Sequence, residues 1–96
     1  MKLTKFEIDY VLPAFDDVTD QRYILAPEGE ELEEMKSVEF KISSNLQADG
    51  SYEGDLTKDE RLIIVSVLQE YLSNRFSPND YESDDIQKIM ERLRWK

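Results

Sequence analysis

The hydrophobic residues change their spacing at Thr57, and this change limits the folds that the chain can adopt. Before Thr57, apolar and polar side chains alternate over residues 3–12 and again over 38–44, which is the period of a half-buried strand. After Thr57, apolar side chains recur at the spacing of an amphipathic helix. The sequence therefore predicts mainly strands in residues 1–56 and two helices in residues 57–96.

The first part of the chain carries the signals of a small antiparallel sheet. The expected strands are residues 3–12, residues 22–26 and the two arms of a hairpin over residues 38–56. Pro13 ends the first strand, and the sequence Ala48-Asp49-Gly50 supplies the turn of the hairpin. Between them, Pro27 opens a glutamate-rich segment, and we expect a short helix over residues 27–36.

The second part begins with a helix start signal. Thr57 and Glu60 have the spacing of a capping box, in which each side chain bonds the backbone N–H of the other. A second helix is expected to begin near Ser83, with one apolar stripe made by Ile86, Ile89, Met90 and Leu93. The predicted fold is a single α+β domain, with a three- or four-stranded antiparallel sheet covered by two C-terminal helices.

The charge and the missing residue types limit the chemistry. The 96 residues include 22 Asp and Glu against 12 Lys and Arg, and neither His nor Cys occurs. Imidazole or thiolate metal sites, nucleophilic cysteines and histidine-dependent triads are excluded. The formal net charge of −10 repels nucleic acid and anionic membranes. We therefore expect no enzymatic activity, no cofactor and no direct binding of nucleic acid or membrane.

The N-terminal residues and the apolar runs bear on location. Lys5, Glu7 and Asp9 follow Met1 too closely to leave room for the apolar part of a secretory signal. The densest apolar run, residues 62–68, is far shorter than the ~20 residues of a membrane span. These features predict a cytoplasmic protein.

The acidic residues gather in three stretches, from which we predict a partner-binding surface. Its residues are Asp16, Asp17 and Asp20; Glu28, Glu30, Glu31, Glu33 and Glu34; and Asp80, Tyr81, Glu82, Asp84 and Asp85. An array of carboxylates resembles the charge of duplex DNA and competes for a basic cleft on a nucleic-acid-processing protein. Phage-encoded anti-CRISPR and anti-restriction proteins, and immunity proteins, share this size and charge, although no family motif carries the likeness. The alternative interpretation is a solvated acidic surface.

Two further hypotheses come from different classes of function. The first is a calcium loop with the spacing of an EF-hand, formed by Asp49, Ser51, Glu53, Asp55 and Glu60. Its alternative is a hairpin turn followed by the capping box at Thr57. The second hypothesis is a homo-oligomeric adaptor, in which the apolar stripe of the last helix packs on a copy of itself.

Overall fold

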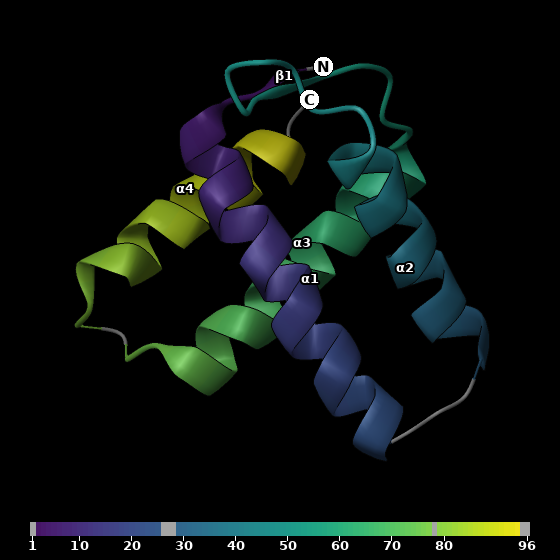
Figure 1. Cartoon of the computed structure of the whole chain (residues 1–96). Helices are drawn as coiled ribbons and strands as arrows, with labels where there is room; N and C mark the ends of the chain where they lie inside the picture. Colours follow the sequence, from purple (N-terminus) through teal and green to yellow (C-terminus); the bar gives the residue numbers. More distant parts are fainter. Residues whose placement is uncertain (1, 26–28, 78, 95–96) are drawn as a thin grey trace.

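Four helices make up most of the protein, and the predicted sheet is wrong. The computed structural model describes residues 2–25, 29–77 and 79–94, with the side chains of all of these except 21–25 and 29–32 (Figure 1). The helices are α1 (Lys5–Leu25), α2 (Gly29–Ser43), α3 (Lys58–Arg75) and α4 (Tyr81–Arg94). Within these residues, one antiparallel sheet has two short strands, β1 (Lys2–Leu3) and β2 (Tyr52–Glu53). The three- or four-stranded sheet is therefore replaced by helices.

Helix α1 covers the residues predicted as the first strand. Thr4 and Glu7 form a capping box: the Glu7 N–H donates to Thr4 Oγ1 at 3.2 Å, and the Thr4 N–H donates to Glu7 Oε1 at 2.9 Å. The buried side chains follow a helical period and are Ile8, Val11, Ala14, Phe15 and Val18. Phe6, which an alternating pattern would bury, is 54% exposed. The helix continues through Pro13. The strand predicted over residues 22–26 is wrong, because residues 22–25 form the last turn of α1, and residue 26 lies outside the described part of the chain.

Helix α2 replaces the first arm of the predicted hairpin. Met35, Val38 and Ile42 are buried at helical spacing, whereas Phe40, which shares the alternating pattern with Val38 and Ile42, is 71% exposed. The short helix expected over residues 27–36 is part of this longer helix from Gly29, and residues 27 and 28 lie outside the described part of the chain.

The turn of the predicted hairpin is present, although its strands are very short. The Gly50 N–H donates to the Gln47 carbonyl at 3.0 Å, and Gly50 takes the left-handed φ of 87° that favours glycine. Leu46 then bridges Tyr52. Tyr52 also pairs with Leu3, so that β2 adds to the N-terminus of the chain and not to residues 38–44.

The two C-terminal helices are confirmed. Thr57 and Glu60 form the capping box that begins α3, and the whole apolar stripe of α4 is buried. Helix α3 is central, because α1, α2 and α4 all pack against it. In Figure 1, α1 crosses in front of α3, with α4 on the left and α2 on the right. One flank of α1 therefore meets α4 and the other meets α2.

Candidate functional site

The acidic residues predicted to bind a partner are distributed over three helices. They are Asp16, Asp17 and Asp20 on α1; Glu33 and Glu34 on α2; and Asp80, Tyr81, Glu82, Asp84 and Asp85 at the start of α4. Glu28 and the side chains of Glu30 and Glu31 lie outside the described residues. The described residues have very different surroundings, and only some of them are available to a partner.

A pair of carboxyl groups forms where α1 packs against α2. Glu39 of α2 shares a hydrogen bond with Asp16 of α1, and Asp20 and Lys36 are close enough to affect its charge. Burial raises the pKa of Glu39 to about 7, and the hydrogen bond with Asp16 and the charges of Asp16 and Asp20 act in the same direction, while Lys36 opposes them. Near pH 7 Glu39 is therefore partly protonated, and the pair carries less negative charge than two separate carboxylates.

Glu39 is not among the partner-binding residues predicted from the sequence, because the sequence predicts a strand over residues 38–44. On a helix, Glu39 follows the buried Met35 by four residues and precedes the buried Ile42 by three. This spacing puts its carboxyl group at the border of the apolar face. The helical spacing of Met35, Val38 and Ile42 is the sequence signal that identifies the position of Glu39.

Asp17 has an intramolecular role. Arg75 at the end of α3 donates to Asp17 Oδ1 from Nε at 2.8 Å and also from Nη2. The hydrogen bond and the charge of Asp17 raise the pKa of Arg75. The Asp17 side chain is only 12% exposed. This pair ties α1 to α3 and leaves Asp16 and Asp20 as the exposed acids of the group.

Asp80 is likewise part of a turn. The Ser77 N–H donates to Asp80 Oδ2 at 2.9 Å, and the buried Ser83 donates its hydroxyl to the Ser77 carbonyl at 2.6 Å. Asp80 therefore stabilises the connection between α3 and α4.

Aromatic and acidic side chains meet where the start of α4 lies beside α1. The Tyr10 hydroxyl donates to Asp85 Oδ2 at 3.0 Å. Burial raises the pKa of Tyr10 to about 12, together with the bond to Asp85 and the charge of Glu82. Phe6 packs edge-on against Tyr10, with ring centroids 5.4 Å apart. Tyr81, 76% exposed, lies at the edge of this cluster, and the charge of Glu82 raises its pKa.

One exposed face of α1 runs between the Asp16–Glu39 pair and the cluster around Tyr10 and Asp85. Its residues, called here the α1 face, are Phe6, Asp9, Pro13, Asp16 and Asp20, all exposed and spaced by three or four positions. At 1.5 Å per residue, the face is about 21 Å long. Glu39 flanks it from α2, and Glu82 and Asp85 flank it from α4. The fold thus brings the first and third acidic stretches beside the same helix.

Three of the five predicted calcium ligands, Asp49, Ser51 and Glu60, bond other groups of the protein, and Asp55 is exposed. Asp49 Oδ1 accepts from the N–H and the hydroxyl of Ser51, at 2.9 and 2.6 Å, and Glu53 is in β2. Glu60 accepts from the Thr57 N–H and from Lys41 Nζ, each through Oε1. Over the described residues, no group of three or more acidic side chains is arranged to hold a metal ion. Nothing in this geometry favours calcium.

The stripe of α4 that was expected to contact a second copy faces inward. Ile86, Ile89, Met90 and Leu93 are at most 4% exposed and belong to the single hydrophobic core of the described chain. Self-association through this stripe would require the core to open.

No family model, curated protein or solved structure matches the chain. Over residues 2–25, 29–77 and 79–94, none of the helices combines the length and the apolar character that crossing a bilayer requires. The arrangement of charged and aromatic side chains around α1 is therefore the feature from which a function can be inferred.

Proposed function

We propose that the protein is a non-enzymatic inhibitor or adaptor that uses the α1 face to occupy a basic, nucleic-acid-binding surface on another protein. The observation that carries this proposal is the Tyr10–Asp85 hydrogen bond, which holds the third acidic stretch against α1, the helix that carries the first acidic stretch. Asp16 and Asp20, both exposed on α1, continue the negative surface toward α2.

The density of charge tells how far the surface imitates DNA. Asp9, Asp16 and Asp20 span about 17 Å of α1, and Glu82 and Asp85 flank them, which gives about one carboxylate per 3 Å. Duplex DNA carries one charge per about 1.7 Å. The surface therefore has about half the charge density of DNA, and Lys5 further offsets Asp9 through an ion pair at 3.2 Å.

Exposed aromatic side chains at one end of the face supply the rest of the affinity. Phe6 and Tyr81 are 54% and 76% exposed, and Tyr is frequent among the residues that dominate binding energies. Tyr81 next to Glu82 offers a ring face and a carboxylate to one arginine or lysine of a partner. Electrostatic attraction then sets the association rate, and the aromatic contacts set the lifetime of the complex.

The first test is a pull-down from native or host lysate with the tagged protein. The bound fraction is washed at low salt and then at about 0.5 M salt, where the Debye length is about 4 Å. We expect a basic nucleic-acid-binding protein that is retained at low salt and released by salt or by competitor DNA. A partner that resists both salt and DNA, or no specific partner, would contradict the proposal.

Two double variants locate the surface. Asp16→Lys with Asp20→Lys reverses charges on the α1 face, and Asp55→Lys with Glu91→Lys reverses two exposed acids elsewhere. Both variants change the net charge equally, so any difference in capture comes from position. We expect the first variant to lose the partner and the second to keep it. Equal losses would mean that net charge alone attracts the partner.

A further inference from the structure

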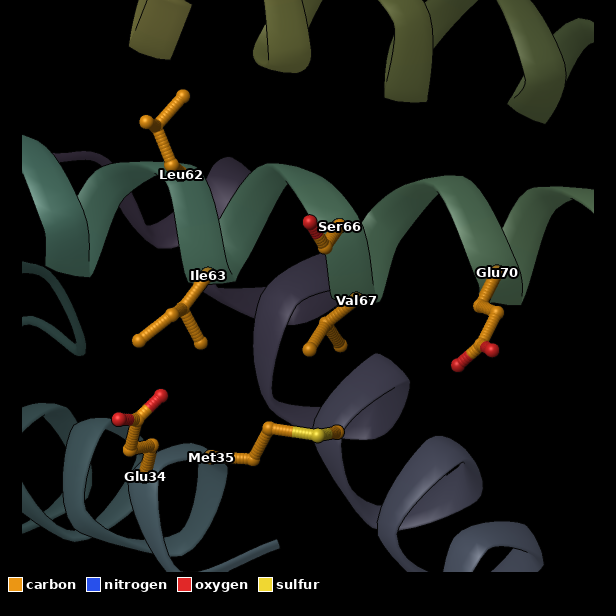
Figure 2. A pocket seen from close by; sticks show the side chains of 7 residues that line it. All are labelled: Glu34, Met35, Leu62, Ile63, Ser66, Val67 and Glu70. Carbon is orange, nitrogen blue, oxygen red and sulfur yellow. The ribbon is translucent and has the colours of Figure 1, made fainter. Parts of the chain in front are cut away.

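A second surface lies on the other flank of α2, where this helix meets α3. A cavity of about 180 Å³ opens between them, lined by Glu34, Met35, Leu62, Ile63, Ser66, Val67 and Glu70. Figure 2 shows Ile63 and Val67 pointing from α3 toward α2, with Met35 beneath them, while Glu34 and Glu70 lie toward either end. The floor is therefore apolar and the two ends are acidic.

The cavity continues into a shallower hollow. That hollow, of about 450 Å³, shares Glu34, Leu62 and Ile63 with it and adds Ser37, Val38, Asp59 and Glu60. Together they form a groove along α3 from Asp59 to Glu70, which is about 16 Å or three helical turns. Leu62 is 44% exposed at the edge of this groove.

The groove has one sign of charge. Every charged side chain among the described residues that line the two hollows is a carboxylate, and Glu34 and Asp59 are exposed. Glu60 is partly neutralised by Lys41, whose Nζ lies 2.8 Å from its Oε1. An apolar partner with positive charge at its edges is complementary to this arrangement.

We propose that the α2–α3 groove binds one basic amphipathic helix of about three turns, contributed by a protein partner. Apolar side chains at i, i+3, i+4 and i+7 would enter the cavity, and flanking lysines or arginines would face Glu34, Asp59 and Glu70. The site goes beyond the proposed function, because it uses residues that the α1 face does not.

Other occupants fit less well. An added strand needs a free sheet edge, whereas helices and their side chains line this groove. The basic end of α4 in a second copy is also unsuitable, because the apolar stripe of that helix is buried in its own core.

The probe is a synthetic 15-residue peptide with leucines at helical spacing and lysine or arginine elsewhere, labelled for fluorescence anisotropy. Its control is a peptide of the same composition with the order permuted, so that charge is kept and the apolar stripe is lost. We expect the helical peptide to bind at least tenfold more tightly. Equal affinities would overturn the proposal.

Paired protein variants separate the groove from the overall charge. The control for Glu34→Lys is Glu33→Lys, because Glu33 is exposed and does not line the groove. Ser66→Trp fills the cavity, and its control is Gln69→Trp on the exposed side of α3. We expect Glu34→Lys to weaken binding about tenfold and Ser66→Trp by at least as much, with changes below threefold in both controls. Circular dichroism checks that each variant is folded.

The double variant Asp16→Lys with Asp20→Lys distinguishes this site from the proposed function. It should keep peptide binding within about threefold, and methyl NMR shifts on adding peptide should concentrate at Met35, Ile63 and Val67. If this double variant lost peptide binding and Ser66→Trp kept it, the peptide would bind the α1 face, and the proposal of a site in the groove would be wrong. Equal effects of Glu33→Lys and Glu34→Lys, with no effect of Ser66→Trp, would show attraction by net charge only.

Discussion

The pair between Glu7 and Arg92 is expected to be the most strongly coupled ion pair of the described chain. Arg92 on α4 donates to Glu7 Oε2 from Nε at 2.7 Å and to Glu7 Oε1 from Nη2 at 2.5 Å, and Nη2 also reaches the Lys2 carbonyl at 2.6 Å. The same carboxylate caps α1 through the Thr4 N–H. The Glu7–Arg92 pair therefore connects β1, the start of α1 and the end of α4.

The magnitude follows from the exposure of the two side chains, 8% for Glu7 and 36% for Arg92. Hydrogen bonds to charged groups contribute about 1.5–3 kcal/mol, and the partial exposure of Arg92 favours the lower end. We expect Arg92→Met to cost about 2 kcal/mol, because the Glu7 carboxylate stays buried without its countercharge. For a domain of this size, that lowers the Tm by roughly 10 °C. The coupling free energy between Glu7→Gln and Arg92→Met should be about 1 kcal/mol.

The assay is urea unfolding of the wild type, both single variants and the double variant, followed by circular dichroism. The control is the same cycle with Lys5→Met and Asp9→Asn, whose side chains are 64% and 62% exposed and should couple by only a few tenths of a kcal/mol. If the Glu7–Arg92 coupling were no larger than that of the control pair, the structural argument would be refuted.

The pH dependence of the coupling gives a second check. Burial raises the pKa of Glu7, but the hydrogen bond and charge of Arg92 and the bonds to Thr4 outweigh it and hold the pKa below the ordinary 4.5. A carboxyl group with a lowered pKa in the folded state stabilises the protein above its unfolded pKa and loses this effect as the pH falls through the folded value. The coupling should therefore persist at pH 5 and shrink only at more acidic pH.

Three further variants test other parts of the fold. Pro13→Ala should raise the free energy of unfolding by roughly 1–3 kcal/mol in urea, because Pro13 lies inside α1 and lacks the N–H of a helical hydrogen bond; no gain would contradict a continuous helix. Glu39→Gln should gain stability relative to the wild type between pH 5 and pH 8, since the raised pKa of about 7 makes ionised Glu39 unfavourable in the folded state; parallel urea midpoints across that range would count against the Asp16–Glu39 pair. Gly54→Ala should cost roughly 1–3 kcal/mol, because its new Cβ would lie 2.7 Å from the hydroxyl of the buried Tyr52; an unchanged Tm would show that this ring can move.

The sequence predicted the C-terminal half because two independent signals agree there. The capping box at Thr57 marks the start of α3, and the apolar stripe of α4 repeats over two turns without an alternating pattern to compete with it. The sequence does not separate the candidate partner-binding residues at the start of α4 from structural ones, since Asp80 and Glu82 carry the same charge. Only the fold assigns Asp80 to a turn and Asp85 to the Tyr10 hydroxyl.

The strands predicted in the N-terminal half were wrong because short apolar runs fit both the period of a strand and the period of a helix. In residues 6–12 the alternating set includes Ile8, which is also the first of the helical set Ile8, Val11, Phe15 and Val18. The helical set is longer and so favours a helix. A second signal also favours a helix, since Thr4 and Glu7 have the same capping spacing as Thr57 and Glu60. Pro13 does not end the first element as predicted, because a proline on the exposed side of a helix is tolerated at a cost in stability.

The two capping boxes also help to show which carboxylates are engaged within the protein and which are available to the proposed partner. Each capping glutamate is paired with a base on another helix, Glu7 with Arg92 and Glu60 with Lys41, so these acids stabilise the packing of helices. Intramolecular bonds also engage Asp9, Asp17, Asp49, Asp80 and Asp85. The net charge of −10 therefore overstates the negative charge that is available on the surface to the proposed basic partner. Because Asp16 and Asp20 are exposed on the α1 face and Glu34 lines the α2–α3 groove, charge reversal at these few positions should separate recognition from general attraction.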